Sequence, residues 1–211
     1  MKKVWAVSKT ALGVAVVASL AGCASLMATP SSTTQVAYAV YGVTGFVNGG
    51  RVVNAVIESN KHFLVNATIR DNPPPGVLPV TPGRYIIAGT SEDLAADVET
   101  VGIEASSDTA ACPGAQVEEK GTDRIFNGGG RLITYTVCLY PYQGGYQADA
   151  VAIYNKHTGT LKDDLEGAFM KSTSVTPITR IKKFLHTFKV GLLASGGHVA
   201  RIKYYVPPQK L

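Results

Sequence analysis

Cysteine is the residue type with the widest choice of chemistry in this chain, and it occurs three times, at Cys23, Cys112 and Cys138. Such a residue can be a buried core thiol, half of a disulfide, a reactive nucleophile or an attachment point. Cys23 follows the tripeptide Leu20-Ala21-Gly22 and precedes a run of Ser, Thr and Pro. The small residues before it would let the backbone enter a peptidase cleft, which favours an attachment point.

The segment before Cys23 is typical of an export signal. Lys2, Lys3 and Lys9 give it a positive start, and Ala11 to Ala21 form an uncharged apolar run. That run is shorter than the about 20 apolar residues that a membrane-spanning helix needs. Its length and flanks fit a secretory signal peptide; the alternative is an uncleaved hydrophobic helix with a structural cysteine.

The residues Leu20-Ala21-Gly22-Cys23, with the segment before them, resemble the lipobox and signal peptide of bacterial lipoproteins. The resemblance implies a diacylglyceryl thioether on Cys23, removal of residues 1–22 and acylation of the new amino terminus. Several acyl chains anchor a protein to a membrane almost irreversibly. Because Ala24 and not Asp follows the cysteine, the sorting rule of these lipoproteins implies the periplasmic side of the outer membrane rather than the inner membrane. The resemblance ends at residue 23.

The charge of the processed chain gives little support to nucleic-acid binding. The whole chain of 211 residues carries a net charge of +5, and removing the three lysines of the signal peptide leaves 17 basic against 15 acidic residues.

Residues 23–35 are small and polar and predict a lipid-anchored flexible tether. Residues 36–211 have the length of a single domain. The expected partners are the membrane, reached through the anchor, and other envelope proteins or cell-wall material.

With Cys23 lipidated, Cys112 and Cys138 remain as an even pair. Export, which the resemblance implies, places them in an oxidising compartment, and we therefore predict a disulfide between them. Two free thiols and a redox-active pair are the alternatives. The redox alternative lacks the Cys-x-x-Cys spacing that depresses a thiol pKa.

Hydrophobic periodicity predicts an α+β fold, with an antiparallel or mixed sheet and about three helices packed on one face. A β-α-β opening is expected at 36–70, followed by a proline-dense loop at 71–83. A prominent hairpin is expected at 131–154, where two alternating runs flank a Pro-Tyr-Gln-Gly-Gly turn. The remaining predicted elements are a strand at 84–89, helices at 161–169 and 178–194, and a strand from 198; residues 91–106 fit either a helix or a strand.

Tyrosines gather around the turn of the predicted hairpin. Tyr140, Tyr142 and Tyr146, with Gln143, form a candidate binding patch, because aromatic faces beside amides serve sugars and protein partners. The alternative is that tyrosine is simply a favoured strand residue.

The predicted helix at 178–194 carries basic residues opposite its apolar stripe. Such a face can lie on an anionic membrane, or the stripe can pack on the sheet while the charges stay in water, which the need for a core partner favours. The candidate membrane-facing residues are Arg180, Lys182, Lys183, His186 and Lys189.

No local motif in the sequence assigns a metal, a cofactor or a catalytic residue. The four histidines are scattered, the glycines at 128–130 open a predicted strand rather than a phosphate-binding helix, and Ser195 lacks the first glycine of a nucleophile elbow. The expected function is therefore a lipid-anchored envelope protein with a binding or scaffolding domain. The alternative is an envelope hydrolase whose site is assembled from residues distant in sequence.

Overall fold

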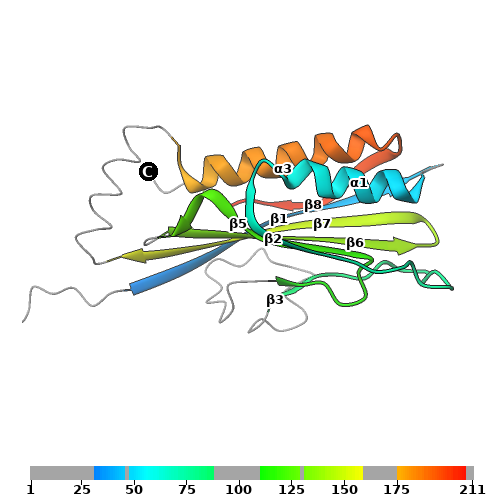
Figure 1. The fold of residues 1–211 in the computed structure, drawn as a ribbon, viewed down its shortest axis with the longest axis horizontal. Helices are drawn as coiled ribbons and strands as arrows, with labels where there is room; N and C mark the ends of the chain where they lie inside the picture. The colour runs from blue at the N-terminus through cyan, green and yellow to red at the C-terminus, as the bar shows by residue number, and fades with distance from the viewer. Residues whose placement is uncertain (1–30, 46–47, 88–109, 129–130, 159–174, 208–211) are drawn as a thin grey trace, which may run out of the picture.

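The computed structural model describes residues 31–45, 48–87, 110–128, 131–158 and 175–207 (Figure 1). Cys23 and its signal peptide, the ambiguous segment 91–106 and the predicted helix at 161–169 lie outside these residues. The described part has the predicted α+β fold, with two helices and one large sheet. Within it, no helix is long and apolar enough to cross a membrane.

Six strands form an antiparallel sheet, and two short strands pair separately beneath it. Across the large sheet the order is β2 (Leu64–Asp71), β5 (Val117–Gly128), β6 (Arg131–Tyr142), β7 (Gly145–Thr158), β1 (Ser31–Thr44) and β8 (His198–Tyr205). The separate pair is β3 (Ile86–Ile87) and β4 (Ala110–Ala111).

The β6–β7 hairpin confirms the strongest sequence prediction. Tyr142 pairs with Gly145 at its turn, and Gly145 has a φ of +132°, a conformation that favours glycine. The β-α-β order of the opening is also confirmed, although three strands separate β1 from β2 in the sheet. β5 was not among the predicted strands.

β1 begins earlier than the sequence suggested. Ser31 pairs with Thr158, and the pairing continues without a break to Val43 opposite Tyr146. Residues 31–35, predicted as the end of the tether, therefore belong to the sheet. The reason is tertiary: β7 is long enough to give this polar stretch a partner, and Ser and Thr carry no local signal that distinguishes a paired strand from a linker.

Both helices cover one face of the sheet, which we call the helix face (Figure 1). α1 (Gly49–Asn60) begins at Asn48, whose side chain accepts from the Arg51 N–H. α3 (Pro177–Ala194) begins at Thr176, whose hydroxyl accepts from the Thr179 N–H, with proline in the first turn as predicted. Its apolar stripe is buried against the sheet: Ile178, Ile181, Phe184, Leu185, Phe188 and Leu192.

A second, smaller core lies on the opposite side of the sheet, which we call the loop face. It is covered by the proline-dense loop and by β3 and β4, which run beneath the sheet (Figure 1). The side chains of β6 divide between the two cores as alternation requires: Tyr135 and Val137 face the helices, whereas Cys138 and Tyr140 face the loop.

Candidate functional site

The predicted disulfide joins Cys112, just after β4, to Cys138 in the middle of β6. Their Cα atoms are 5.5 Å apart, and the bond closes a sequence separation of 26 residues. In a chain-entropy estimate, a closed loop of this size stabilises the fold by about 3–4 kcal/mol. The disulfide therefore fastens the covering segment to the centre of the loop face.

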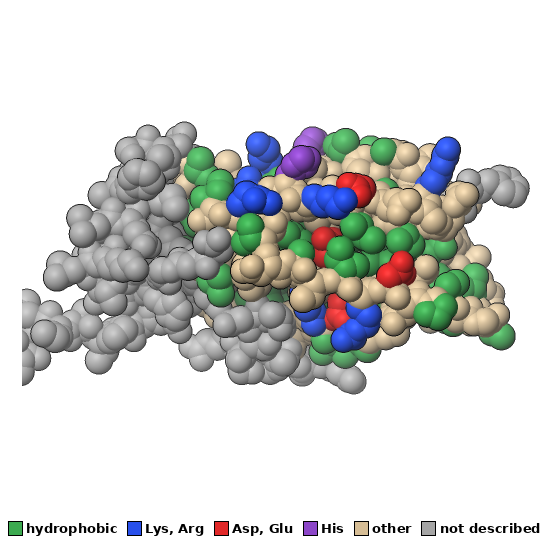
Figure 2. Space-filling view, in the orientation of Figure 1, with side chains coloured by type: hydrophobic (Ala, Val, Ile, Leu, Met, Phe, Trp, Pro, Cys, Tyr) green, Lys and Arg blue, Asp and Glu red, His purple; other side chains and the backbone are tan. Residues whose placement is uncertain are grey.

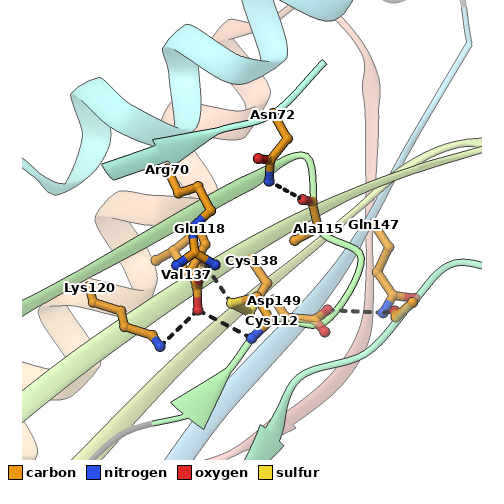
Figure 3. Close-up of a disulfide and its surroundings, with 11 residues drawn as sticks. Arg70, Asn72, Cys112, Ala115, Glu118, Lys120, Val137, Cys138, Gln147 and Asp149 are labelled. Atoms are coloured by element: carbon orange, nitrogen blue, oxygen red, sulfur yellow. Dashed lines mark hydrogen bonds and ion pairs between the residues drawn. A yellow bond between two sulfur atoms is a disulfide. The ribbon is translucent and has the colours of Figure 1, made fainter. Parts of the chain in front are cut away.

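Two carboxyl groups flank the disulfide. Cys138 is paired across the sheet with Glu118 of β5 and with Asp149 of β7, so the three residues form one row across neighbouring strands (Figure 3). Both acids are buried, Glu118 at 8% and Asp149 at 0% exposure. A buried carboxylate requires hydrogen bonds or a counter-charge.

Glu118 has both. Its Oε2 lies 3.0 Å from Nη1 of Arg70, and its Oε1 lies 2.8 Å from Nζ of Lys120 (Figure 3). Oε1 also accepts a hydrogen bond of 3.3 Å from the backbone N–H of Cys112. Glu118 is thus an anchor for the covering segment, and its charge is already balanced.

Asp149 is less well satisfied. Its Oδ1 accepts from Nε2 of Gln147 at 3.0 Å, and its carboxyl accepts a backbone hydrogen bond from Tyr85. Its Oδ2 and the hydroxyl of Tyr140 have no hydrogen-bond partner within the described part of the chain. Burial raises the pKa of Asp149 to about 7, against the lowering effect of those hydrogen bonds.

The candidate tyrosine patch is not one open face. Tyr140 is only 1% exposed and belongs to the core of the loop face. A Cβ at Gly83 would lie 2.6 Å from a ring carbon of Tyr140, so the loop backbone packs directly on this ring. Tyr146 is half-buried on the opposite side of the sheet, against the helix-face core. Tyr142 is half-buried at the turn.

Gln143 is exposed at the turn and also contacts the proline-dense loop. Its backbone N–H donates to the Pro79 carbonyl at 2.9 Å, and its Nε2 donates to the Leu78 carbonyl at 3.3 Å. Gln147 adds a hydrogen bond of 3.1 Å from Nε2 to the carbonyl of Gly83. The hairpin turn therefore holds the proline-dense loop in place, although Gln143 and Gly144 themselves are exposed.

The exposed surface at this end of the molecule is the loop. Val77 is 86% exposed, Val80 is 72% and Leu78 is 37%, and we call these three side chains the apolar loop surface. The stretch 72–83 contains no charged residue and five prolines. Sequence reasoning predicted a loop here but placed the binding patch on the tyrosines; the signal it missed was an uncharged Val-Leu-Pro-Val run.

Arg180 leaves the predicted basic face of α3. Its Nε lies 3.0 Å from Oδ2 of Asp123, its side chain is 12% exposed, and its guanidinium lies 4.4 Å from the centre of the Phe63 ring. A partly buried arginine takes this position because a buried carboxylate of β5 requires a counter-charge, which no helical pattern reveals. Lys182, Lys183 and His186 are exposed and Lys189 is half-buried.

Buried polar contacts join both helices to β5. Asp123, fully buried, accepts from the Tyr135 hydroxyl at 2.9 Å and from the backbone N–H groups of Ile125 and Phe126 at 2.7 and 3.1 Å, in addition to Arg180. The last residue of α1 makes the equivalent contact: Nδ2 of Asn60 donates to Oε2 of Glu119 at 2.6 Å. Burial raises the pKa of Glu119 to about 7, which the hydrogen bond from Asn60 partly offsets.

A groove of about 320 Å³ lies at the β2 edge of the sheet. Its lining contains neither histidine nor serine, and its one acid is Glu118, which already pairs with Arg70 and Lys120. Among the residues that the structure describes, no three His, Cys, Asp or Glu side chains gather as a metal site.

Comparisons with protein-family models, with curated proteins and with solved structures found no match to this chain. Function must therefore be inferred from the surfaces themselves. The described residues present an uncharged, apolar, hydrogen-bonded loop on one side of the sheet and a basic helix on the other.

Proposed function

We propose that this protein is a lipid-anchored cell-envelope protein whose domain binds or scaffolds a protein partner through the apolar loop surface. The observation that carries the proposal is the exposure of Val77 and Val80, at 86% and 72%, on a loop that hydrogen bonds hold in one position. The lipobox supplies the anchor, and the disulfide is consistent with an oxidising compartment.

Preorganisation supports a binding role for the loop. Five prolines restrict its backbone, and Gln143 and Gln147 fix its carbonyl groups to the hairpin. A surface that is already ordered loses little conformational entropy when a partner binds. Rigid exposed aliphatic side chains are therefore better suited to recognition than the same residues on a mobile segment.

The chemistry of this surface favours a protein partner over cell-wall sugar or nucleic acid. Sugars are commonly bound on aromatic faces, but Tyr140 is buried and Tyr146 lies on the other side of the sheet. Nucleic acids require basic residues, and the stretch 72–83 has no charge. Valine and leucine side chains instead match an apolar protein surface, which removes them from water on binding.

The hydrolase alternative gains no support from the buried acids. Asp123, Asp149 and Glu119 are each at most 1% exposed, and each is committed to contacts inside the fold. A general acid or base must reach its substrate within hydrogen-bond distance. These carboxyl groups are buried where a substrate at the surface does not meet them.

The anchor is tested by Cys23→Ser. Serine cannot form the thioether, so we expect the variant to lose both acylation and the normal membrane-bound form. The measurement is the mass of the amino-terminal peptide together with partitioning into a detergent phase. Ser25→Ala, two residues away, is the matched control and is expected to stay acylated. Retention of the acylated form by Cys23→Ser would refute the anchor.

The binding surface is tested by Val77→Asp with Thr81→Asp as its matched control. Both positions are exposed on the same loop, so both variants should unfold within about 0.5 kcal/mol of the wild type. We expect a stoichiometric partner from detergent-solubilised envelopes to be retained by wild type and Thr81→Asp, and reduced at least severalfold by Val77→Asp. A partner that Val77→Asp retains in full would exclude the apolar loop surface as its binding site.

A further inference from the structure

The side of α3 that faces away from the sheet combines basic and apolar residues. Val190 and Leu193 are 50% and 48% exposed on this side, near the end of the helix, and the lysines come before them. We call this side the outer α3 face, and its residues are Lys182, Lys183, His186, Lys189, Val190 and Leu193. It is distinct from the buried stripe that packs on the sheet.

The charged side chains around α3 are all positive along the sequence. Residues 175–207, which include α3 and β8, contain six Lys and Arg residues and no Asp or Glu. Among the ion pairs between described residues, the one that involves α3 joins Arg180 to Asp123. The neighbouring helix α1 has one acid, Glu58, which forms an ion pair with Lys61, the residue just after the helix. In Figure 2, blue and purple side chains lie along the top of the molecule, on the helix side, with a red group beside them; a further cluster of blue and red lies lower on the same view.

The start of β1 lies close enough to the outer α3 face for a chain anchored at Cys23 to bring that face to a membrane. β1 begins at the same end of the molecule at which α3 begins (Figure 1). Residues 24–31 can span up to about 26 Å when extended, whereas a helix with its side chains is only about 10–12 Å thick. A chain held at Cys23 can therefore place the outer α3 face on the same bilayer surface.

We propose that the outer α3 face docks on an anionic phospholipid surface and turns the loop face toward the aqueous compartment. This inference rests on the proposed lipid anchor, which raises the local concentration so that a weak electrostatic contact suffices. Lys182, Lys183 and Lys189 are attracted to anionic headgroups, and Val190 and Leu193 enter the boundary between headgroups and acyl chains.

The proposal differs from the usual behaviour of a basic amphipathic helix. Such a helix buries its apolar stripe in the membrane, but the stripe of α3 is occupied by the sheet. The contact therefore uses the opposite face and needs no opening of the fold. It also leaves the apolar loop surface, on the other side of the sheet, free for a partner.

Tryptophan fluorescence gives a direct test, because the only tryptophan of the sequence is Trp5, in the segment that processing would remove. Leu193→Trp and Val77→Trp place one indole on the outer α3 face and one on the apolar loop surface. Each full-length lipoprotein is reconstituted into vesicles containing brominated phosphatidylglycerol. We expect severalfold stronger quenching at position 193 than at position 77.

Charge dependence completes the experiment. Adding Lys182→Glu and Lys183→Glu to Leu193→Trp, or raising the salt concentration, should bring quenching at position 193 down to the level at position 77. Both lysines are exposed, so the fold is unaffected. Strong quenching at 193 that ignores both changes would overturn the electrostatic contact, and equal quenching at the two positions would overturn docking altogether.

Vesicle flotation separates this proposal from the proposed anchor. A chain that floats with vesicles at high salt is anchored, whatever α3 does, and the quenching comparison then decides the docking. A chain that floats only at low salt, and not after Lys182→Glu and Lys183→Glu, refutes the anchor and supports the docking. A chain that floats under neither condition refutes both.

Discussion

Replacing Asp123 with alanine is expected to lower the free energy of unfolding by about 3–5 kcal/mol, because it leaves a buried charge without its partner. Asp123 is 0% exposed and accepts four hydrogen bonds, from Tyr135, Arg180 and two backbone N–H groups. Its removal would leave the Arg180 guanidinium against the Phe63 ring with no counter-charge. The measurement is urea denaturation with the disulfide intact.

Matched controls identify the cause of this loss. Asp71→Ala removes an exposed aspartate from the neighbouring strand and should change stability by less than about 0.5 kcal/mol. Combining Asp123→Ala with Arg180→Met removes both charges and should recover part of the loss, since the stranded cation is then gone. Wild-type stability in Asp123→Ala would show that the contacts among β5, β6 and α3 do not hold the helix.

Stability is expected to fall as the pH rises from about 4 to about 7. Burial raises the pKa of Asp149 from 3.8 to about 7, and that of Glu119 from 4.5 to about 7. Between those limits the native state binds protons that the unfolded chain has already released. The stabilisation is therefore fully present below the pKa values of the unfolded chain. It has been lost once the pH has risen past the pKa values of the folded chain. At 1.36 kcal/mol per pKa unit, each carboxyl group contributes about 3–4 kcal/mol.

Neutral variants should remove this dependence group by group. Asp149→Asn and Glu119→Gln cannot release a proton, so each should flatten the curve of unfolding free energy against pH, and the double variant should flatten it most. Asp71→Asn, at an exposed aspartate of β2, is the matched control and should keep the wild-type slope. Denaturation at several pH values between about 4 and about 7 provides the curves. Stability that rises with pH in this interval would contradict the expectation.

Local patterns were sufficient for the hairpin and for both described helices. The β6–β7 hairpin has alternating faces and glycine turn chemistry, and α3 has a cap, a proline in its first turn and a 3–4 apolar repeat. Each of these signals lies within one element. The pairing of Cys112 with Cys138 was also predictable, because the expected lipidation of Cys23 left no third thiol.

β5 and the surroundings of two candidate residues, Tyr140 and Arg180, could not be predicted from local patterns. β5 begins Val-Glu-Glu-Lys-Gly-Thr-Asp, which looks exposed until distant groups such as Asn60 and Arg180 supply partners for its acids. Tyr140 is buried because a loop some 60 residues earlier in the chain packs on its ring. Arg180 has helical spacing typical of a solvated face, but a strand far away in sequence determines its environment. These are long-range effects that a single sequence does not encode locally.

The position of β1 has a consequence for how the chain would fold under the proposed export. The first strand of the domain pairs with β7 on one side and with β8, the last strand, on the other. Contacts between such distant segments form slowly, because a long loop must close before they are made. If the chain is translocated from its amino terminus, the sheet cannot be completed until Tyr205 has crossed. Under the proposed export, the strand order would therefore leave the sheet one strand short until β8 has crossed the membrane.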